Sequence, residues 1–250
     1  MKQEFKELFI SRWERYFPGA ELPIIYYYSD EAGTSELKDS KNEYRCLIGN
    51  LKRVREGHSF VYSVRSRGCT GGKRYSGFTD RLRKNFEYFL SYGIPGKLEG
   101  ERYKQSPELV KQYMKNRQFS PAPGKYLIFK RWDKLTEDDQ PSAVIFFAAA
   151  DVLSGLFTLA NYDRADACGV ITPMGAGCSS IISYPLQEAK SGDFRCVLGM
   201  FDVSARPYVL NNTLTFTIPM KRFEAMVGNM EESFLITNSW AVIRERIADK

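Results

Sequence analysis

The sequence is poor in the residues from which most metal and catalytic sites are built. Its 250 residues include a single histidine, His58, and five cysteines, none of which form a CxxC pair. This spacing excludes a zinc ribbon and a thioredoxin-type motif. An odd number of cysteines at irregular intervals also does not suggest a disulfide framework. We therefore expect reduced thiols and predict no metal site.

Long apolar runs and internal repeats are absent as well. The longest apolar run, near residues 143–150, is much shorter than the roughly 20 residues that cross a bilayer, so no membrane partner is expected. The first residues mix acids with bases and lack the apolar segment of a secretory signal. Together these features favour a cytoplasmic protein, and they leave its oligomeric state open.

Hydrophobic residues make up 43% of the chain and aromatic residues 14%, which is enough for a sizeable core. Helical and strand patterns alternate along the sequence, which predicts the α+β class: a mixed sheet with helices packed on it, in a single compact domain. We expect one domain over residues 1–250. A break between subdomains is predicted near residues 118–124, where two prolines and a glycine interrupt the pattern.

Periodicity and breaker residues locate the individual elements. Helices are predicted at residues 2–16, 44–56, 80–92, 107–117, 151–159, 220–229 and 233–248, with a short one after residue 178. Strands are predicted at residues 22–28, 60–64, 126–132, 143–147, 168–171, 195–200 and 214–218. Residues 29–43, 67–78 and 201–207 are expected to be loops.

Positive charge is concentrated in one part of the chain. The net charge is +6, and residues 45–84 contain eleven Lys or Arg but only two acidic residues. A local excess of this kind indicates either a solvated basic surface or attraction of an anionic ligand. No nucleic-acid-binding motif accompanies it, so nucleic acid is the weaker expectation.

A first glycine–cysteine loop lies inside this basic segment, at residues 67–78. Its four glycines predict turns that let the backbone approach a ligand closely. Cys69 has several cations near it in sequence, which would lower the pKa of its thiol. Cys69, Gly71, Gly72 and Lys73 are therefore predicted to bind a ligand.

A second glycine–cysteine loop, residues 172–180, follows a short apolar run and precedes a predicted helix. Backbone N–H groups at such a helix start face bound anions and stabilise a thiolate. Gly177, Cys178 and Ser179 are predicted ligand-binding residues on this ground, and Arg206 is added as a cation from the loop at 201–207.

The two loops are predicted to form one pocket, in which Lys73 and Arg206 complete an anionic subsite. Each loop follows a predicted strand, and loops after strands that run the same way gather at one edge of a sheet. Cys46 and Cys196 lie among apolar residues and are predicted to be core thiols without a site role.

Three functions compete. The first is that of a soluble protein that binds a small anionic ligand or cofactor, of unknown identity, in this pocket. The second is a thiol-dependent enzyme, or an iron–sulfur or metal-binding redox protein in which Cys168 and His58 would add ligands; a Cys–His pair would have to use His58. The third is a non-enzymatic anion or nucleic-acid binding module. Whether the chain is an enzyme is left open.

Three segments carry a family resemblance: residues 68–78, residues 175–185 and residues 198–206. As a set, they resemble domain-of-unknown-function family 169, also described as uncharacterised ArCR proteins. The resemblance extends from about Leu22 to Ile247. It implies a cytoplasmic prokaryotic protein of one domain, and it implies no particular activity.

Overall fold

The computed structural model describes residues 1–32, 44–117 and 119–249. The described residues form a seven-stranded sheet in the order β2-β3-β1-β4-β7-β6-β5. Neighbouring strands are antiparallel except for β5 and β6, which are parallel. The strands are β1 (Ile24–Ser29), β2 (Phe60–Ser63), β3 (Tyr126–Arg131), β4 (Ala143–Ala148), β5 (Val170–Ile171), β6 (Cys196–Gly199) and β7 (Leu214–Pro219). The predicted α+β class with a mixed sheet is confirmed.

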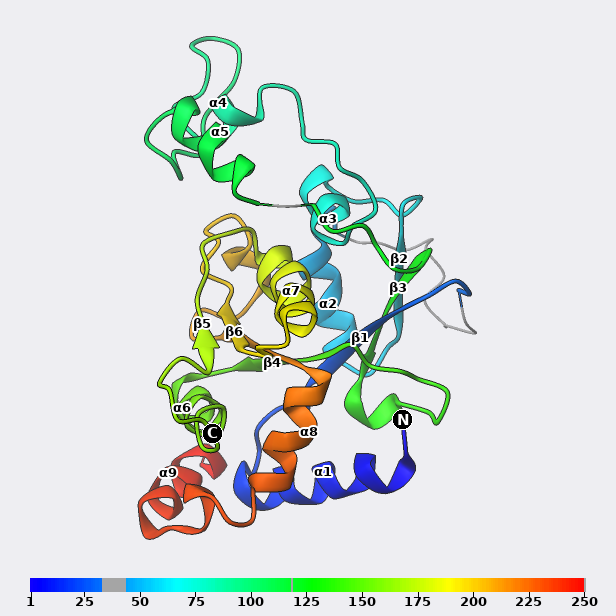
Figure 1. Cartoon of the computed structure of the whole chain (residues 1–250), viewed down its shortest axis with the longest axis vertical. Helices are drawn as coiled ribbons and strands as arrows, with labels where there is room; N and C mark the ends of the chain where they lie inside the picture. The colour runs from blue at the N-terminus through cyan, green and yellow to red at the C-terminus, as the bar shows by residue number, and fades with distance from the viewer. Residues whose placement is uncertain (33–43, 118, 250) are drawn as a thin grey trace.

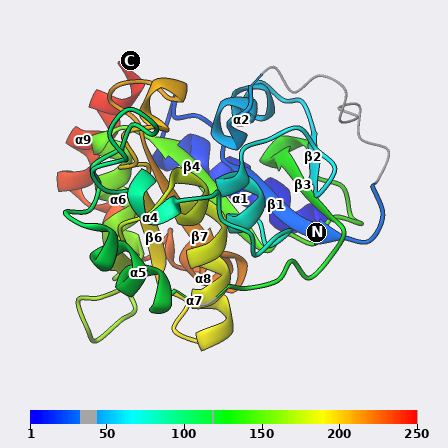
Figure 2. The same ribbon diagram turned by 90° about the horizontal axis from the view of Figure 1, so that it is seen from above.

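Helices cover both faces of this sheet (Figure 1). One face carries α1 (Gln3–Tyr16), α6 (Ala150–Leu159), α8 (Met220–Asn229) and α9 (Asn238–Ala248). The other carries α2 (Leu47–Arg55), α3 (Thr70–Tyr75) and α7 (Tyr184–Ser191), the last preceded by a π-helical turn at Ser179–Ser183. Beyond this second layer lie α4 (Phe86–Phe89) and α5 (Pro107–Lys115), which are the elements furthest from the sheet in Figure 1 and lie in front of β6 in the view from above (Figure 2).

Alternating side chains of the strands divide the core into two clusters, because successive residues of a strand point to opposite faces. In β1, Ile25 belongs to the cluster beneath α1 and α8, whereas Ile24 and Tyr26 belong to the cluster beneath α2. Strand β4 is the fourth of seven and is buried along its whole length. The prediction of a buried central strand at residues 143–147 is therefore confirmed.

Two local predictions were wrong. Residues 70–75, expected to be loop, form the helix α3. Gly68, which precedes this helix and was counted among the glycines of the predicted loop, is needed for close packing, because a Cβ there would lie 2.3 Å from Oη of Tyr62. The helix predicted at residues 80–92 is reduced to α4, because Asn85 adopts a left-handed conformation (φ 58°) immediately before it.

Most of the other predicted helices are present in the structure at nearly the predicted residues. Helix α5 begins at Pro107, the first residue of the predicted range, and Ser106 is its N-cap: the Oγ of Ser106 accepts a hydrogen bond from the N–H of Leu109 at 3.3 Å. The loop predicted at residues 29–43 lies mostly outside the described residues.

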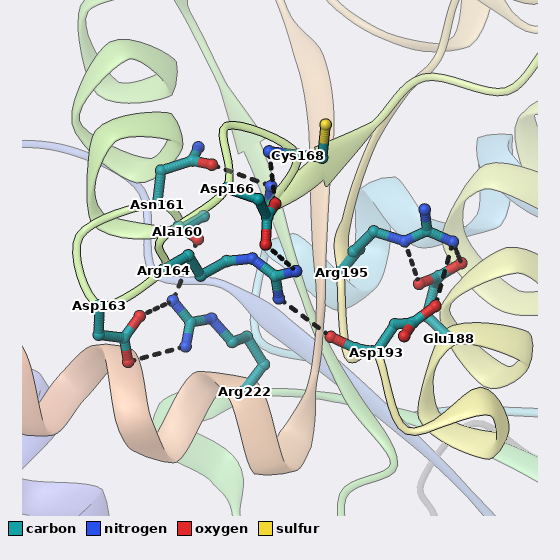
Figure 3. A network of polar contacts seen from close by, with 11 residues as sticks. Ala160, Asn161, Asp163, Arg164, Asp166, Cys168, Glu188, Asp193, Arg195 and Arg222 are labelled. Carbon is teal, nitrogen blue, oxygen red and sulfur yellow. Dashed lines mark hydrogen bonds and ion pairs between the residues drawn. The ribbon is translucent and has the colours of Figure 1, made fainter.

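An ion-pair network holds the connection between α6 and β5 against α8 and α7 (Figure 3). Arg222 of α8 pairs with both carboxylate oxygens of Asp163 and donates to the carbonyl of Ala160 at 3.0 Å. Arg195 binds both carboxylate oxygens of Glu188 in α7 at 2.8 and 2.9 Å. Each of these charged side chains is paired with one of opposite charge, so we interpret the network as structural.

Candidate functional site

A cavity of about 1110 Å³ lies between the layer of α2 and α3 and the outer region that contains α4 and α5. Both glycine–cysteine loops line it, together with parts of residues 82–90, 101–113 and 199–205. Of the residues predicted to bind a ligand, six are at its wall: Cys69, Gly71, Gly72, Lys73, Gly177 and Cys178.

The two loops meet for a different reason from the one that the sequence suggested. Tracing the pairings along the sheet, β2 and β5 lie at opposite edges and run in opposite directions. What joins the loops is the packing of α3 on the π-helical turn, where Ser183 Oγ donates to the carbonyl of Tyr75 at 2.8 Å. The predicted topology for this convergence was therefore wrong.

Cys69 is the N-cap residue of α3 and its side chain is exposed. Its Sγ accepts a hydrogen bond from the N–H of Gly72 at 3.2 Å. Its own N–H donates to the carbonyl of Arg45 at 3.0 Å, which ties the start of α3 to the start of α2. The exposed thiol is thus held in one orientation at the cavity wall.

Cys46 differs from the core thiol that the sequence predicted. It is the N-cap residue of α2, is only partly buried, and lines the cavity. Burial raises the pKa of its thiol, hydrogen bonds from the backbone of Gly49 and Ile48 oppose that rise, and Cys69 and Asp202 add to it. A third thiol is therefore present at this site.

Cys178 is buried, with 5% of its surface exposed. Burial, followed by the proximity of Cys46, Cys69 and Asp202, raises the pKa of its thiol well above the ordinary value. The expectation that a helix start would lower this pKa was wrong. The helix start is already capped, because the N–H of Gly177 donates to Oδ2 of Asp202 at 2.9 Å.

The remaining two predicted residues lie outside the cavity lining. Ser179 is fully buried and its hydroxyl donates to the carbonyl of Ala176 at 2.7 Å. The guanidinium of Arg206 donates to the carbonyls of Leu210, at 3.0 Å, and Asn211, at 2.7 Å, and so holds the loop that precedes β7. Both side chains have structural partners, and the ligand-binding role predicted for them has no geometric support.

Lys73 is at the wall, but its ammonium is already hydrogen-bonded. Its Nζ donates to the carbonyl of Val64 at 2.8 Å. Basic residues at the cavity outnumber acidic ones: the described lining contains seven Lys or Arg, Lys73 included, and two carboxylates. The cations are Arg45, Arg65, Arg67, Lys73, Arg74, Arg83 and Lys104, and the acids are Glu101 and Asp202.

Sequence reasoning missed the aromatic residues of the cavity lining and one of its carboxylates, that of Asp202. The aromatic residues at the lining include Phe86, Phe89, Tyr103, Tyr113 and Phe201. The signal that was available is the high aromatic content of residues 86–113, part of which was assigned to the inner side of a predicted helix at residues 80–92. Asp202 lay in the same predicted loop as Arg206, and only the fold shows that the carboxylate, not the cation, faces the site.

The outer region is fastened to the rest of the molecule through Arg117. Its guanidinium lies 4.8 to 5.2 Å from the ring centres of Tyr75, Tyr113 and Tyr184, one each from α3, α5 and α7. Tyr113 Oη also donates to the carbonyl of Met174 at 2.9 Å. These contacts position α5 over the second glycine–cysteine loop.

The metal and Cys–His alternatives lack a geometric basis in the part of the chain that the structure describes. No three His, Cys, Asp or Glu side chains there are arranged to hold a metal ion. His58 follows the C-terminal end of α2, whereas Cys69 lies beside its N-terminal end, about 13 Å away along a nine-residue helix. Cys168 is exposed near the network of Figure 3 and does not line the cavity.

The fold and the cavity together define a class: a mixed α+β domain with a basic, aromatic and thiol-lined cavity on one side of its sheet. No helix among the described residues is long and apolar enough to pass through a membrane.

The chain belongs to domain-of-unknown-function family 169, described as uncharacterised ArCR, whose model matches residues 23–229. The match confirms the resemblance and ends before α9, which the resemblance was expected to include. No curated protein and no solved structure matches the chain.

Proposed function

We propose that this protein binds a small anionic molecule with an apolar or aromatic body in the cavity between α3 and the α4–α5 region. The observation that carries the proposal is the cavity itself. Its volume of about 1110 Å³ lies slightly above the range typical of ligand sites, roughly 300–1,000 Å³, so the cavity has room for a small molecule.

The distribution of side chains supports both parts of such a ligand. Phe86, Phe89 and Phe201 offer apolar surface for a ring or chain. Arg45, Arg65 and Arg67 lie in or near the first glycine–cysteine loop in sequence, also line the cavity, and offer charge to an anionic group. The excess of cations over carboxylates at the lining favours a negatively charged ligand over a positive one.

The cavity is also concave and bounded by the outer region, which favours a small molecule over a polyanion. Polyanions are bound on open basic surfaces or along grooves that follow the backbone. The cysteines would lie beside the bound molecule and would not need to react with it. Binding of a ligand without reaction is therefore the simplest function in which the basic, aromatic and thiol groups of the lining all take part.

The test uses anilinonaphthalene sulfonate, a fluorescent probe with an aromatic body and one anionic group. We expect saturable binding by the folded protein, and we expect Arg45→Gln combined with Arg65→Gln to weaken it by about fivefold, since two partly exposed ion pairs are lost. Lys52→Gln combined with Lys97→Gln is the matched control. It removes the same charge from exposed positions outside the lining and should leave binding unchanged.

Equal weakening by both double variants would show that net charge alone attracts the probe, and would contradict a site at the cavity. Native mass spectrometry of the freshly purified protein provides a second measurement. A bound molecule that leaves on denaturation, and that carries negative charge, would identify the chemistry directly.

A further inference from the structure

Two of the three cysteines at the cavity occupy equivalent places on neighbouring helices. Cys46 is the N-cap of α2 and Cys69 is the N-cap of α3. At Cys69 the backbone N–H of Gly72 hydrogen-bonds to the sulfur at 3.2 Å. At Cys46 the backbone N–H groups of Ile48 and Gly49 oppose the rise in the pKa of the thiol that burial causes. The thiolate is the reactive form in thiol–disulfide exchange, and the exposed Cys69 is the member of the pair that a small disulfide can reach.

The two backbones are joined at this point. The N–H of Cys69 donates to the carbonyl of Arg45 at 3.0 Å, and that carbonyl belongs to the peptide group that leads into Cys46. With standard bond lengths, this hydrogen bond limits the distance between the two Cα atoms to about 7 Å. Disulfides span Cα distances of roughly 4.4–6.8 Å. Both residues also line the same cavity, and Cys69 is close enough to Cys46 to raise the pKa of its thiol.

We propose that Cys46 and Cys69 are a redox-active pair that forms a reversible disulfide in the wall of the cavity on reaction with a small disulfide such as oxidised glutathione. This role goes beyond ligand binding and needs no ligand.

The exchange proceeds in two steps. The exposed thiolate of Cys69 attacks one sulfur of the small disulfide, forms a mixed disulfide and releases one thiolate, which takes up a proton. The sulfur of Cys46, after losing its proton, then attacks Sγ of Cys69 and releases the second small thiol. The protein loses two electrons and two protons, and both leave with the two thiol molecules.

The other three cysteines are less suited to this reaction. Cys178 is near both members of the pair, but its burial raises the pKa of its thiol and no backbone hydrogen bond fixes its distance from Cys69. Cys196 is fully buried on the opposite face of the sheet, with its sulfur 3.9 Å from that of Met226. Cys168 is exposed but does not line the cavity.

The experiment is equilibration of the whole chain with mixtures of reduced and oxidised glutathione, followed by alkylation of the remaining thiols and peptide mapping. The expected product is one cross-link between the peptides of Cys46 and Cys69, with the chain lighter by two hydrogen atoms and restored by excess reduced glutathione. A cross-link from Cys69 to Cys178, or a mixed disulfide at Cys69 that persists in the unaltered chain, would overturn the proposal.

Two variants sharpen the result. In Cys46→Ser the mixed disulfide at Cys69 should accumulate, because the second attack is lost. Cys168→Ser is the matched control, since it removes an exposed thiol elsewhere and should leave the cross-link unchanged. If Cys46→Ser fails to fold, the peptide map of the unaltered chain still shows whether Cys46 and Cys69 form the disulfide. Failure of anilinonaphthalene sulfonate to bind would refute the proposed ligand site, but it would not affect the test of the disulfide between Cys46 and Cys69.

Discussion

The two faces of the sheet are built in opposite ways. Beneath α1 and α8, the rings of Phe9, Trp13, Phe146 and Phe223 pack edge to face or tilted, with centroids 4.8 to 6.3 Å apart, and the cluster they form is buried. Above the other face, the aromatic rings of the α4–α5 region are only partly buried and line a cavity. The first arrangement stabilises the domain, and the second leaves surface for another molecule.

The largest expected effect is a difference in stability between variants of the buried rings and variants of the rings that line the cavity. Phe146→Ala should lower the free energy of unfolding by about 3–5 kcal/mol, because it leaves a cavity in the closed aromatic cluster. Phe89→Ala should lower it much less, since that ring is only partly buried, yet should weaken binding of the sulfonate probe. Urea titration and probe fluorescence measure the two effects. Similar losses of stability in both variants would contradict the distinction.

A smaller effect is expected where the outer region meets the rest of the molecule. Arg117→Ala removes contacts with the rings of Tyr75, Tyr113 and Tyr184, each worth roughly 0.5–1 kcal/mol. Hydrogen exchange of residues 86–115 should speed up by about tenfold, with little change in the strands. Lys115→Ala, an exposed change at the end of α5, is the control and should leave exchange unaltered.

The cysteines provide the same comparison between faces. Native labelling with a maleimide should modify the exposed Cys69 rapidly and the buried Cys196 only after unfolding. Burial raises the pKa of Cys196 to about 12, so the folded state keeps this proton while the unfolded state loses it near the ordinary value of roughly 8.5.

The sign of the pH effect follows from that difference. The stabilising contribution of the protonated Cys196 is complete below pH 8.5 and is lost as pH rises toward 12. In this window, Cys196→Ala should make the decline of unfolding free energy shallower, by up to about 1.4 kcal/mol per pH unit. Urea titrations at several alkaline pH values measure this slope, and an unchanged slope would contradict the role of burial.

The smallest expected effect concerns nucleic acid. The basic side chains near Cys69 face a bounded cavity, so random DNA should bind weakly in a filter assay at moderate salt. Tight binding that falls steeply with added salt would favour the nucleic-acid module over the small-anion site.

Much of the fold could be predicted because local patterns matched the tertiary environment. The alternation in β7 and the apolar run of β4 indicated their positions, and Ser106 followed by Pro107 marked the start of α5. The prediction failed at residues 67–78, where the high content of glycine was interpreted as evidence of a loop. The glycine at position 68 serves the close approach of Tyr62, a residue six positions away in sequence.

The sequence by itself determined the class of fold, the burial of β4 and the basic character of the region around Cys69, because these depend on local periodicity and composition. The tertiary structure decided which residues share the cavity. It brought Cys46 to the wall, turned Asp202 onto the N–H of Gly177, and directed Arg206 toward main-chain carbonyls. These outcomes depend on packing between α2, α3 and the π-helical turn, which lie far apart in the chain and whose contacts no local pattern records.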